Sequence, residues 1–351
     1  MSYGVGLLGN RAHQMSYGPI LEARQDCRIV AAAEHRADKA GPLEERFGVA
    51  CGADYDAVLE DPDVHIVSIA TDFYLKRPLI ARAVACGKHV LVDKPLSRTV
   101  TEAREIVNAA EGSGIRIVLS YPIRCLPGLA ALAQGVRSGA YANITSYTHY
   151  FVRQFEDSDL MQYVSYPTPV NVNGGGELMN LGSHAVDYLH HLFGMPRRVF
   201  CSMRNAYWDE YRAFGTEDMA TVVCEYEDFV ATLVTGRNKL EEEGPPANAV
   251  DVTARGRWIH AEPETILLNG VALDLPATPV SYSDACVQEL IDSIEEGRDP
   301  VMGVADGLAV AEMTTAAYQS AQTGEFVSLP LDDVNHPMID PDEQVIEGYL
   351  D

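Results

Sequence analysis

The first third of the chain alternates short apolar runs with helical patterns, and this alternation restricts the fold more than any other feature. Apolar runs end at Gly9, Ala33, Ala70, Val92 and Ser120, and each of the first four is followed by a pattern typical of a helix. Continuous apolar strands separated by helices predict a parallel sheet that is covered on both faces. Such a sheet binds ligands beyond the carboxyl ends of its strands, where the strand order reverses.

A different pattern starts near residue 123, where segments rich in β-branched and aromatic residues follow one another. The expected strands are 144–155, 197–207, 219–226, 229–237, 249–260 and 264–275. The expected helices are 127–138, 177–193, 283–296 and 305–323. We therefore predict a Rossmann-type α/β domain over residues 1–122, followed by an α+β domain with a mostly antiparallel open sheet over residues 123–351.

Composition excludes several classes of protein. The 351 residues carry a formal net charge of −25, which argues against nucleic acid or an anionic membrane as a partner. No apolar run approaches the roughly 18 residues of a membrane-spanning helix, and the N-terminus lacks a signal-peptide pattern, so we expect a cytoplasmic protein. The seven cysteines form no CxxC pair, which predicts reduced thiols and no bound metal.

The turn after the first strand is a candidate phosphate site, because amides at a helix N-terminus bind anions. It keeps only the first glycine of the GxGxxG pattern, and Arg11 stands where the main chain normally approaches the phosphates. An ordinary tight turn of an α/β protein explains the same sequence equally well. The cofactor contacts predicted on this turn are Gly9, Asn10, Arg11, Ala12 and His13.

Glu34 ends the second strand, where a carboxylate accepts hydrogen bonds from the adenosine ribose and repels a 2′-phosphate. This position favours NAD as the cofactor. NADP stays possible because Arg36 and Arg11 are cations that can tolerate the phosphate. An ordinary surface glutamate is the alternative interpretation.

Lys94 directly follows another buried strand, at the rim where the ligand crevice is expected. Pro95 fixes the turn that aims this lysine. An ammonium at this rim can donate to a substrate hydroxyl and stabilise it as it becomes an alkoxide. A solvated surface lysine is the alternative.

Asn180, His184 and Asp187 have the spacing of one helix face and follow three consecutive glycines. An imidazole is the natural group to take a hydroxyl proton near neutral pH, and Asp187 is placed to orient the ring or to contact the substrate. A structural histidine is the alternative.

Aromatic residues around Arg153 suit a sugar ring, and the loop 156–176 is either a lid or a contact between subunits.

Together these stretches resemble the Gfo/Idh/MocA family of oxidoreductases, which is named for glucose–fructose oxidoreductase and inositol dehydrogenase. The resemblance covers nearly the whole chain. It rests on Glu34, Ala70-Thr71, Asp93-Lys94-Pro95, Arg124-Cys125-Leu126-Pro127, the triple-glycine signature at 174–187, and the segment from Tyr318 to Leu329. The chain departs from the family pattern in its phosphate turn and at Lys76, where members often have a histidine.

The resemblance implies a catalytic pair in which His184 is the general acid/base and Lys94 polarises the reacting oxygen. Asn180 joins them where many members have an aspartate; it cannot take a proton but can hydrogen-bond a substrate hydroxyl. The further cofactor contacts that it implies are Arg36, Thr71, Asp93 and Lys94. The substrate contacts expected are Arg124, Arg153, Asn180 and Asp187.

The function expected from these features is NAD(P)-dependent hydride transfer at a hydroxyl-bearing carbon of a sugar, a sugar derivative or a cyclitol. One alternative is a glycoside-cleaving enzyme that retains its NAD and works by transient oxidation and elimination. Another is a non-catalytic sugar sensor, which the presence of both Lys94 and His184 disfavours. The family likeness also implies a homodimer or homotetramer assembled through the C-terminal sheet.

Overall fold

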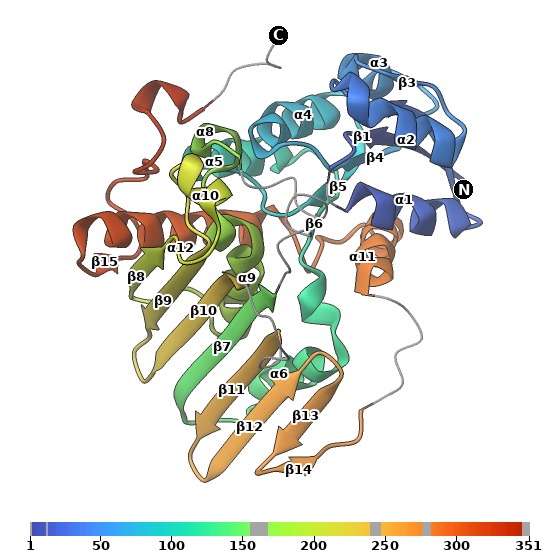
Figure 1. Ribbon diagram of the computed structural model, residues 1–351. Helices are drawn as coiled ribbons and strands as arrows, with labels where there is room; N and C mark the ends of the chain where they lie inside the picture. Colours follow the sequence, from blue (N-terminus) through green and yellow to red (C-terminus); the bar gives the residue numbers. More distant parts are fainter. Residues whose placement is uncertain (1, 12, 155–167, 239–246, 276–281, 346–351) are drawn as a thin grey trace.

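The computed structural model describes residues 2–11, 13–154, 168–238, 247–275 and 282–345, which form two sheets with their helices (Figure 1). Ala12 of the predicted phosphate turn lies outside these ranges, as do residues 155–167, which include most of the predicted lid. Buried side chains of both domains belong to one continuous hydrophobic core.

The first domain is built on a six-stranded parallel sheet with the order β3-β2-β1-β4-β5-β6. Its strands are β1 (Tyr3–Leu8), β2 (Cys27–Ala33), β3 (Cys51–Gly52), β4 (Ile66–Ile69), β5 (His89–Asp93) and β6 (Ile117–Ser120). The order reverses between β1 and β4, so the loops that follow these two strands diverge and open a crevice at their carboxyl ends. The predicted Rossmann architecture is confirmed.

Helices cover both faces of this sheet. They are α1 (Gln14–Ala23), α2 (Ala37–Phe47), α3 (Tyr55–Leu59), α4 (Phe73–Ala85) and α5 (Val100–Ala110). Right-handed crossovers place α1 and α2 on one face and α3, α4 and α5 on the other. The short elements β3 and α3 were not expected from the sequence.

The C-terminal part of the chain returns to the first domain. Helix α11 (Tyr282–Glu296) packs against α1, β5 and β6, and α12 (Val304–Thr323) packs against α5 (Figure 1). The amide of Leu119 donates to the carbonyl of Met302 at 2.8 Å, which ties the edge of the sheet to the segment between these helices. The division of the chain between residues 122 and 123 stays a prediction.

The second domain carries a nine-stranded sheet with the order β14-β13-β12-β11-β7-β10-β9-β8-β15. Its strands are β7 (Ile144–Gln154), β8 (Arg198–Arg204), β9 (Met219–Glu225), β10 (Val230–Asn238), β11 (Asn248–Ala254), β12 (Arg257–Glu262), β13 (Thr265–Leu268), β14 (Val271–Ala272) and β15 (Val327–Ser328). Strands β7 and β10 pair in parallel and the other pairs are antiparallel, so the mostly antiparallel sheet is confirmed.

Two of the strands expected in this sheet are hairpins instead. The segment 249–260 spans most of β11 and β12, and the segment 264–275 contains β13 and β14. The chain reverses at Gly256 and Gly270, whose φ angles of 74° and 80° favour glycine. The apolar pattern continues across both turns, which explains why it predicts single strands.

Helices cover one face of the second sheet. They are α6 (Pro127–Arg137), which contacts β12 and β13, α9 (Ser183–Phe193), which contacts β10, and α12, which contacts β8. The shorter helices are η1 (Pro122–Cys125), α8 (Val170–Asn173), α10 (Asp209–Ala213) and η3 (Pro341–Glu343). The expected helix 177–193 consists of a π-helical turn, η2 (Leu178–Gly182), that continues into α9. Such turns are frequent at functional sites because they widen the helix locally.

Buried Glu217 holds the glycine turn that precedes η2. Its carboxylate accepts hydrogen bonds from the amides of Gly176 at 3.1 Å and Leu178 at 2.9 Å, and from the hydroxyl of Tyr318 at 2.9 Å. A Cβ atom on Gly176 would lie 2.0 Å from the carbonyl oxygen of Glu217, so only glycine fits there. Burial raises the pKa of Glu217 to about 7, while these hydrogen bonds oppose the rise.

We expect Glu217→Gln to remove part of the pH dependence of stability. The native protein holds the Glu217 proton up to about pH 7, whereas a carboxyl at its ordinary pKa of 4.5 releases it earlier, so this residue lowers stability as the pH rises through this range. The free energy of unfolding of the wild type, measured with urea, should fall by roughly 2–3 kcal/mol more than that of the variant. Equal pH profiles for the wild type, the variant and the surface control Glu111→Gln would contradict the assignment.

Candidate active site

Lys94 leaves the end of β5 and reaches into the second domain. Its ammonium donates to the main-chain carbonyl of Asn180 at 2.8 Å and to the side-chain Oδ1 of the same residue at 2.9 Å. An ammonium has three N–H donors, so one of them has no partner among the described residues. Both side chains are buried. The structure thus brings together Lys94 and Asn180, which lie far apart in the sequence.

Burial lowers the pKa of Lys94 to about 8, and the carboxylates of Asp93 and Glu177 limit this fall. The side chain is therefore mostly protonated at neutral pH, and its ammonium is buried where little water reaches it. An ammonium in such a place interacts strongly with a neighbouring oxygen that gains negative charge.

His184 lies in the first turn of α9, just after the η2 turn that contains Asn180. The rings of Tyr121 and Phe151 contact it edge-on, with centroid distances of 5.7 Å and 6.0 Å. Its Nδ1 is buried without a hydrogen-bond partner in the part of the chain that the structure describes. Burial and the nearby charge of Lys94 lower the pKa of His184 well below its usual value, so the ring is neutral and can accept a proton.

A pocket of about 350 Å³ lies between the two domains and includes His184 in its wall. His13, Arg153 and Asn248 supply further polar groups, while Leu181, Phe151, Pro122, Ile123 and Leu126 supply apolar surface. An apolar wall with a few convergent polar groups is the usual composition of a small-molecule site.

Lys76 is a further candidate for a functional residue. The sequence identifies it only as a departure from the family pattern, where members often have a histidine. Its buried ammonium donates to three consecutive carbonyls, those of Asp93 at 2.6 Å, Lys94 at 3.0 Å and Pro95 at 2.7 Å. Three acceptors match the three donors of an ammonium, and the ring of Phe73 lies 4.3 Å from the nitrogen. Lys76 therefore fixes the backbone from which Lys94 projects.

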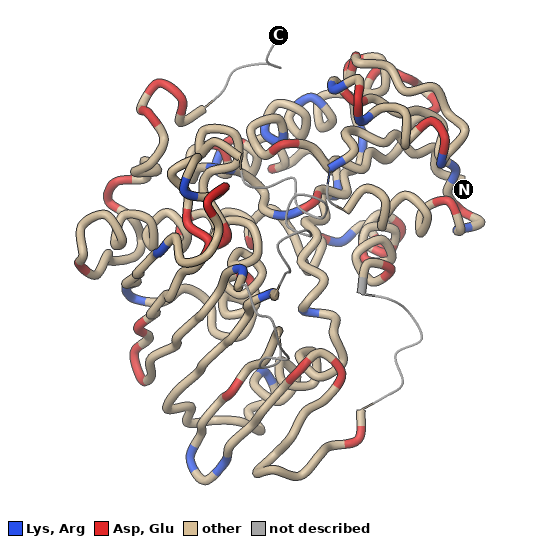
Figure 2. Tube along the Cα trace, in the orientation of Figure 1, with Lys and Arg blue, Asp and Glu red and all other residues tan. Residues whose placement is uncertain are grey.

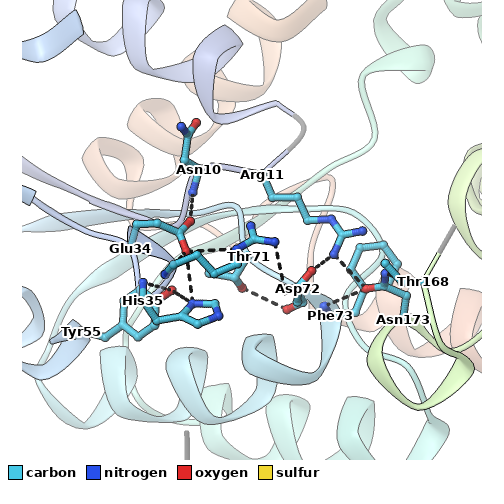
Figure 3. A network of polar contacts seen from close by, with 11 residues as sticks. Asn10, Arg11, Glu34, His35, Tyr55, Thr71, Asp72, Phe73, Thr168 and Asn173 are labelled. Carbon is cyan, nitrogen blue, oxygen red and sulfur yellow. Dashed lines mark hydrogen bonds and ion pairs between the residues drawn. The ribbon is translucent and has the colours of Figure 1, made fainter. Parts of the chain in front are cut away.

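Glu34 occupies the crevice at the carboxyl end of β2 (Figure 3). Its buried carboxylate accepts hydrogen bonds from the amide of Asn10 at 2.7 Å and the amide of Arg36 at 2.9 Å. Oε1 also accepts from Nε of Arg36 at 3.4 Å, whereas Oε2 has the Asn10 amide as its one donor among the described residues and so keeps capacity for a hydroxyl ligand. Gly9 has a φ of 83° and a Cβ on it would lie 2.5 Å from the carbonyl oxygen of Ala70, so this turn requires glycine.

The guanidinium of Arg11 is buried and points away from the turn that carries it (Figure 3). It forms an ion pair with Asp72 and donates to Oδ1 of Asn173 at 3.2 Å, which also accepts from the amide of Phe73 at 3.2 Å. Arg11 therefore connects the loops after β1 and β4 with α8 of the second domain. Its predicted contact with a pyrophosphate stays a prediction.

The residues at this crevice fit a dinucleotide. The strand order reverses there, a glycine-requiring turn follows β1, and the ribose position has the buried carboxylate of Glu34. Of the predicted cofactor contacts, Gly9, Asn10, Glu34, Arg36, Thr71 and Lys94 lie at the carboxyl edge of the parallel sheet or in the loops that follow it and would hold the cofactor. His13 and Asp93 lie at the same edge but contact each other, so their contact with the cofactor stays a prediction.

Arg124 and Asp187, both predicted to contact substrate, bind each other. Arg124 Nε donates to Asp187 at 2.7 Å, and its other nitrogens bind Asp306 and the carbonyl of Val301. Burial alone would lower the pKa of Arg124, but the two carboxylates raise it above its usual value. Neither residue lines the pocket, so their contact with substrate stays a prediction.

Basic and acidic residues are interspersed across both domains (Figure 2). Among the described residues, no helix is long and apolar enough to cross a membrane. The same part of the chain contains no group of three His, Cys, Asp or Glu side chains placed to hold a metal ion.

We expect Lys76→Met to raise the pKa of Lys94. Burial and the charge of Lys94 both lower the pKa of Lys76, and this repulsion acts on Lys94 in the same way. The chain has only five lysines, so carbon-13 labelling of the lysine side chains allows each pKa to be followed by NMR. Lys94 should titrate near 8 in the wild type. The matched control is Lys88→Met, which also removes a buried ammonium from main-chain carbonyls, here those of Asp61 at 2.8 Å and Val64 at 2.7 Å. A wild-type Lys94 that titrates near 10.5 would contradict the placement.

Comparison with known proteins agrees with this geometry. Residues 3–121 match a family model described as an oxidoreductase family with an NAD-binding Rossmann fold, and residues 129–255 match the GFO/IDH/MocA C-terminal domain. The chain is 26% identical to levoglucosan dehydrogenase of Pseudarthrobacter phenanthrenivorans over 54% of its own length and 51% of the relative's. It therefore spans about half the length of this relative.

D-xylose 1-dehydrogenase (NADP(+)) 2 of Haloferax volcanii is 23% identical over 86% of this chain and 94% of its own. The fold is similar to the crystal structure of aldose-aldose oxidoreductase from Caulobacter crescentus complexed with glycerol, with a TM-score of 0.79 at 22% identity over 94% of this chain and 100% of that chain. Both domain matches, together with the two-domain fold and the Lys94, Asn180 and His184 arrangement, identify the chain as a member of the Gfo/Idh/MocA oxidoreductase family.

Proposed function

We propose that the protein is an NAD-dependent dehydrogenase that acts on a hydroxyl-bearing carbon of a sugar, a sugar derivative or a cyclitol. The observation that carries this proposal is the meeting of Lys94 and Asn180 across the domains, next to His184 in the pocket wall. These groups stand at the carboxyl edge of the Rossmann sheet, where a dinucleotide reaches its substrate.

The residues divide the work of alcohol oxidation. The bound nicotinamide supplies the hydride acceptor. The remaining N–H of Lys94 donates to the reacting oxygen and stabilises the negative charge that develops on it. The neutral imidazole of His184 accepts the hydroxyl proton, and the rings of Tyr121 and Phe151 exclude water from it. In the opposite direction the same groups return a proton to the alkoxide.

Glu34 supports NAD over NADP as the cofactor. Its buried carboxylate would lie against a 2′-phosphate and repel it. Arg36, the nearest cation, is already engaged with Glu34 at 3.4 Å and with Asp72 at 3.6 Å. We therefore assign NAD as the preferred cofactor.

Pocket size and composition support a single polyhydroxy ring as the substrate. About 350 Å³ is near the lower end for ligand pockets. Asn248 offers an amide whose Oδ1 lies 2.8 Å from Nε2 of buried His149, which leaves the amide nitrogen for a substrate oxygen. Relatives of the chain are named for anhydrosugar and aldose oxidation, in agreement with this class.

A panel of sugars, anhydrosugars and inositols with NAD and with NADP, followed by absorbance of the reduced cofactor, tests the proposal. At least one polyol should reduce NAD faster than NADP. Lys94→Ala and His184→Ala should each lower kcat by about 10²- to 10⁴-fold, because each removes a group that acts on the reacting oxygen or its proton. Two variants with wild-type turnover would refute these roles, and a wild type that reduces NAD with none of the compounds would refute the function.

We propose that the sheet of the second domain binds a second copy of the chain. Its outer face, opposite α6, α9 and α12, carries Val234 beside Tyr150 in register, and both are partly exposed. Exposed Val230 and Trp258 lie on strands of the same sheet. Apolar and aromatic side chains on an open sheet face suit a symmetric interface.

Light scattering after gel filtration should give the mass of a dimer or tetramer for the wild type and a smaller mass for Val234→Arg, since a buried, unpaired guanidinium weakens such an interface. Val301→Arg changes an exposed valine outside the sheet and serves as the control. A monomeric wild type would contradict the proposed assembly.

A further inference from the structure

The pocket has a second imidazole besides His184. His13 precedes α1, lines the pocket and has a side chain that is 43% exposed. Its Nδ1 lies 3.0 Å from Oδ1 of Asp93, the residue directly before Lys94. The sequence predicts that His13 and Asp93 contact the cofactor. An imidazole paired with a carboxylate can also transfer protons, which a cofactor contact does not require.

Asp93 is an ionised acceptor in this pair. Burial alone would raise its pKa, but His13, Lys76 and Lys94 together lower it well below the usual range. A carboxylate cannot donate, so the Nδ1 of His13 must carry the hydrogen in this contact. The neutral ring then has its lone pair on Nε2, the arrangement that a carboxylate imposes on a proton-accepting histidine.

The surroundings of His184 disfavour its protonated form, so a second proton acceptor nearby would assist the reaction. His184 is almost fully buried, and Lys94 and Arg153 add positive charge around it. An imidazolium formed there is costly, so the proton that His184 accepts must leave quickly. His13 lies nearer to solvent than His184, because its side chain is partly exposed, and its Nδ1 contacts a carboxylate.

We propose that His13 and Asp93 form a dyad that takes the substrate proton from His184 and passes it to solvent. The proposal rests on the dehydrogenase function proposed above and adds the exit route for its proton. Within the part of the chain that the structure describes, His13 is the imidazole that shares the pocket with His184.

Oxidation of one carbinol releases one hydride and one proton. The C–H bond of the carbinol breaks and its electron pair leaves as hydride, for which NAD⁺, when bound, would be the acceptor. The O–H bond breaks, its electrons form the carbonyl, and its proton moves to His184. His184 then gives a proton to Nε2 of His13, whose Nδ1–H stays on Asp93, and water at the pocket mouth takes the proton from His13.

Several charged or titratable groups lie around His13. They are Asp93 and Lys94 at the end of β5, Tyr17 on α1, Arg153 on β7, His184 on α9 and Glu264 at the pocket rim. Asp284 of α11 lies instead in a separate hollow beside Arg24. Asp93 is the carboxylate in direct contact with the ring.

The first test needs neither cofactor nor substrate. Nitrogen-15 NMR of labelled histidine reports which ring nitrogen of His13 carries the hydrogen, with His13→Ala used to assign the signal. We expect the Nδ1–H form in the wild-type protein and a shift toward the Nε2–H form in Asp93→Asn. An Nε2–H form of His13 in the wild type would overturn the proposal, because Nε2 could not accept the proton.

The second test is chemical rescue. His13→Ala should lower kcat for polyol oxidation by about 10- to 100-fold in dilute, non-imidazole buffer, and added imidazole should restore at least part of it by occupying the vacated space. The KM for the polyol and the dissociation constant of NAD, measured by fluorescence, should change less than about threefold if the residue moves protons. His191→Ala, at the far end of α9 beside Arg137, is the matched control and should be unaffected by imidazole.

The outcomes separate this proposal from the one on which it rests. An active wild type whose His13→Ala variant keeps full turnover overturns the dyad alone. A variant that loses activity together with NAD affinity, and that imidazole does not restore, makes His13 a cofactor contact and also overturns the dyad. A wild type that oxidises no polyol overturns the dehydrogenase function and the dyad with it.

Discussion

The hydrogen bonds from Lys94 to Asn180 join the two domains at the point where their chemistry meets. Their geometry depends on supports from both sides. On the first domain, Lys76 fixes the backbone around Lys94 by binding three successive carbonyls. On the second, the carboxylate of Glu177 accepts from the side-chain Nδ2 of Asn180 at 3.1 Å, and Glu217 anchors the glycine turn before it. The buried polar groups on both sides of the Lys94–Asn180 contact are themselves hydrogen-bonded, and they restrict this contact to a single geometry.

The same buried charges set the protonation states of the site. The cations Lys76 and Lys94 surround the Asp93 carboxylate and hold it ionised, while Lys94 and Arg153 act against a positive charge on His184. A site of this kind keeps a donor and a neutral base side by side near neutral pH, because burial disfavours a second cation next to the first. The fold thus separates the role of polarising an oxygen from the role of accepting its proton.

Sequence reasoning predicted the elements and site residues that have strong local patterns. Lys94 was found because it follows an apolar strand, and Asn180 and His184 because they share a helix spacing within a glycine-rich signature. The sequence does not predict the role of Lys76, because its partners are main-chain carbonyls, and every residue type has a main-chain carbonyl. Arg124 and Asp187 were each assigned to the substrate, since a sequence does not tell which distant charges pair with one another. The short β3 and α3 lack enough residues for a periodic pattern.

The proposed mechanism requires a substrate hydroxyl that reaches both the Lys94 ammonium and the His184 ring, which lines the pocket between the domains. A crystal structure of the protein with NADH and the best polyol substrate measures this directly. We expect one hydroxyl oxygen within hydrogen-bond distance of Lys94 Nζ and of the His184 ring, with its carbon facing the nicotinamide. A polyol bound elsewhere, or one whose oxygens contact neither side chain, would contradict it.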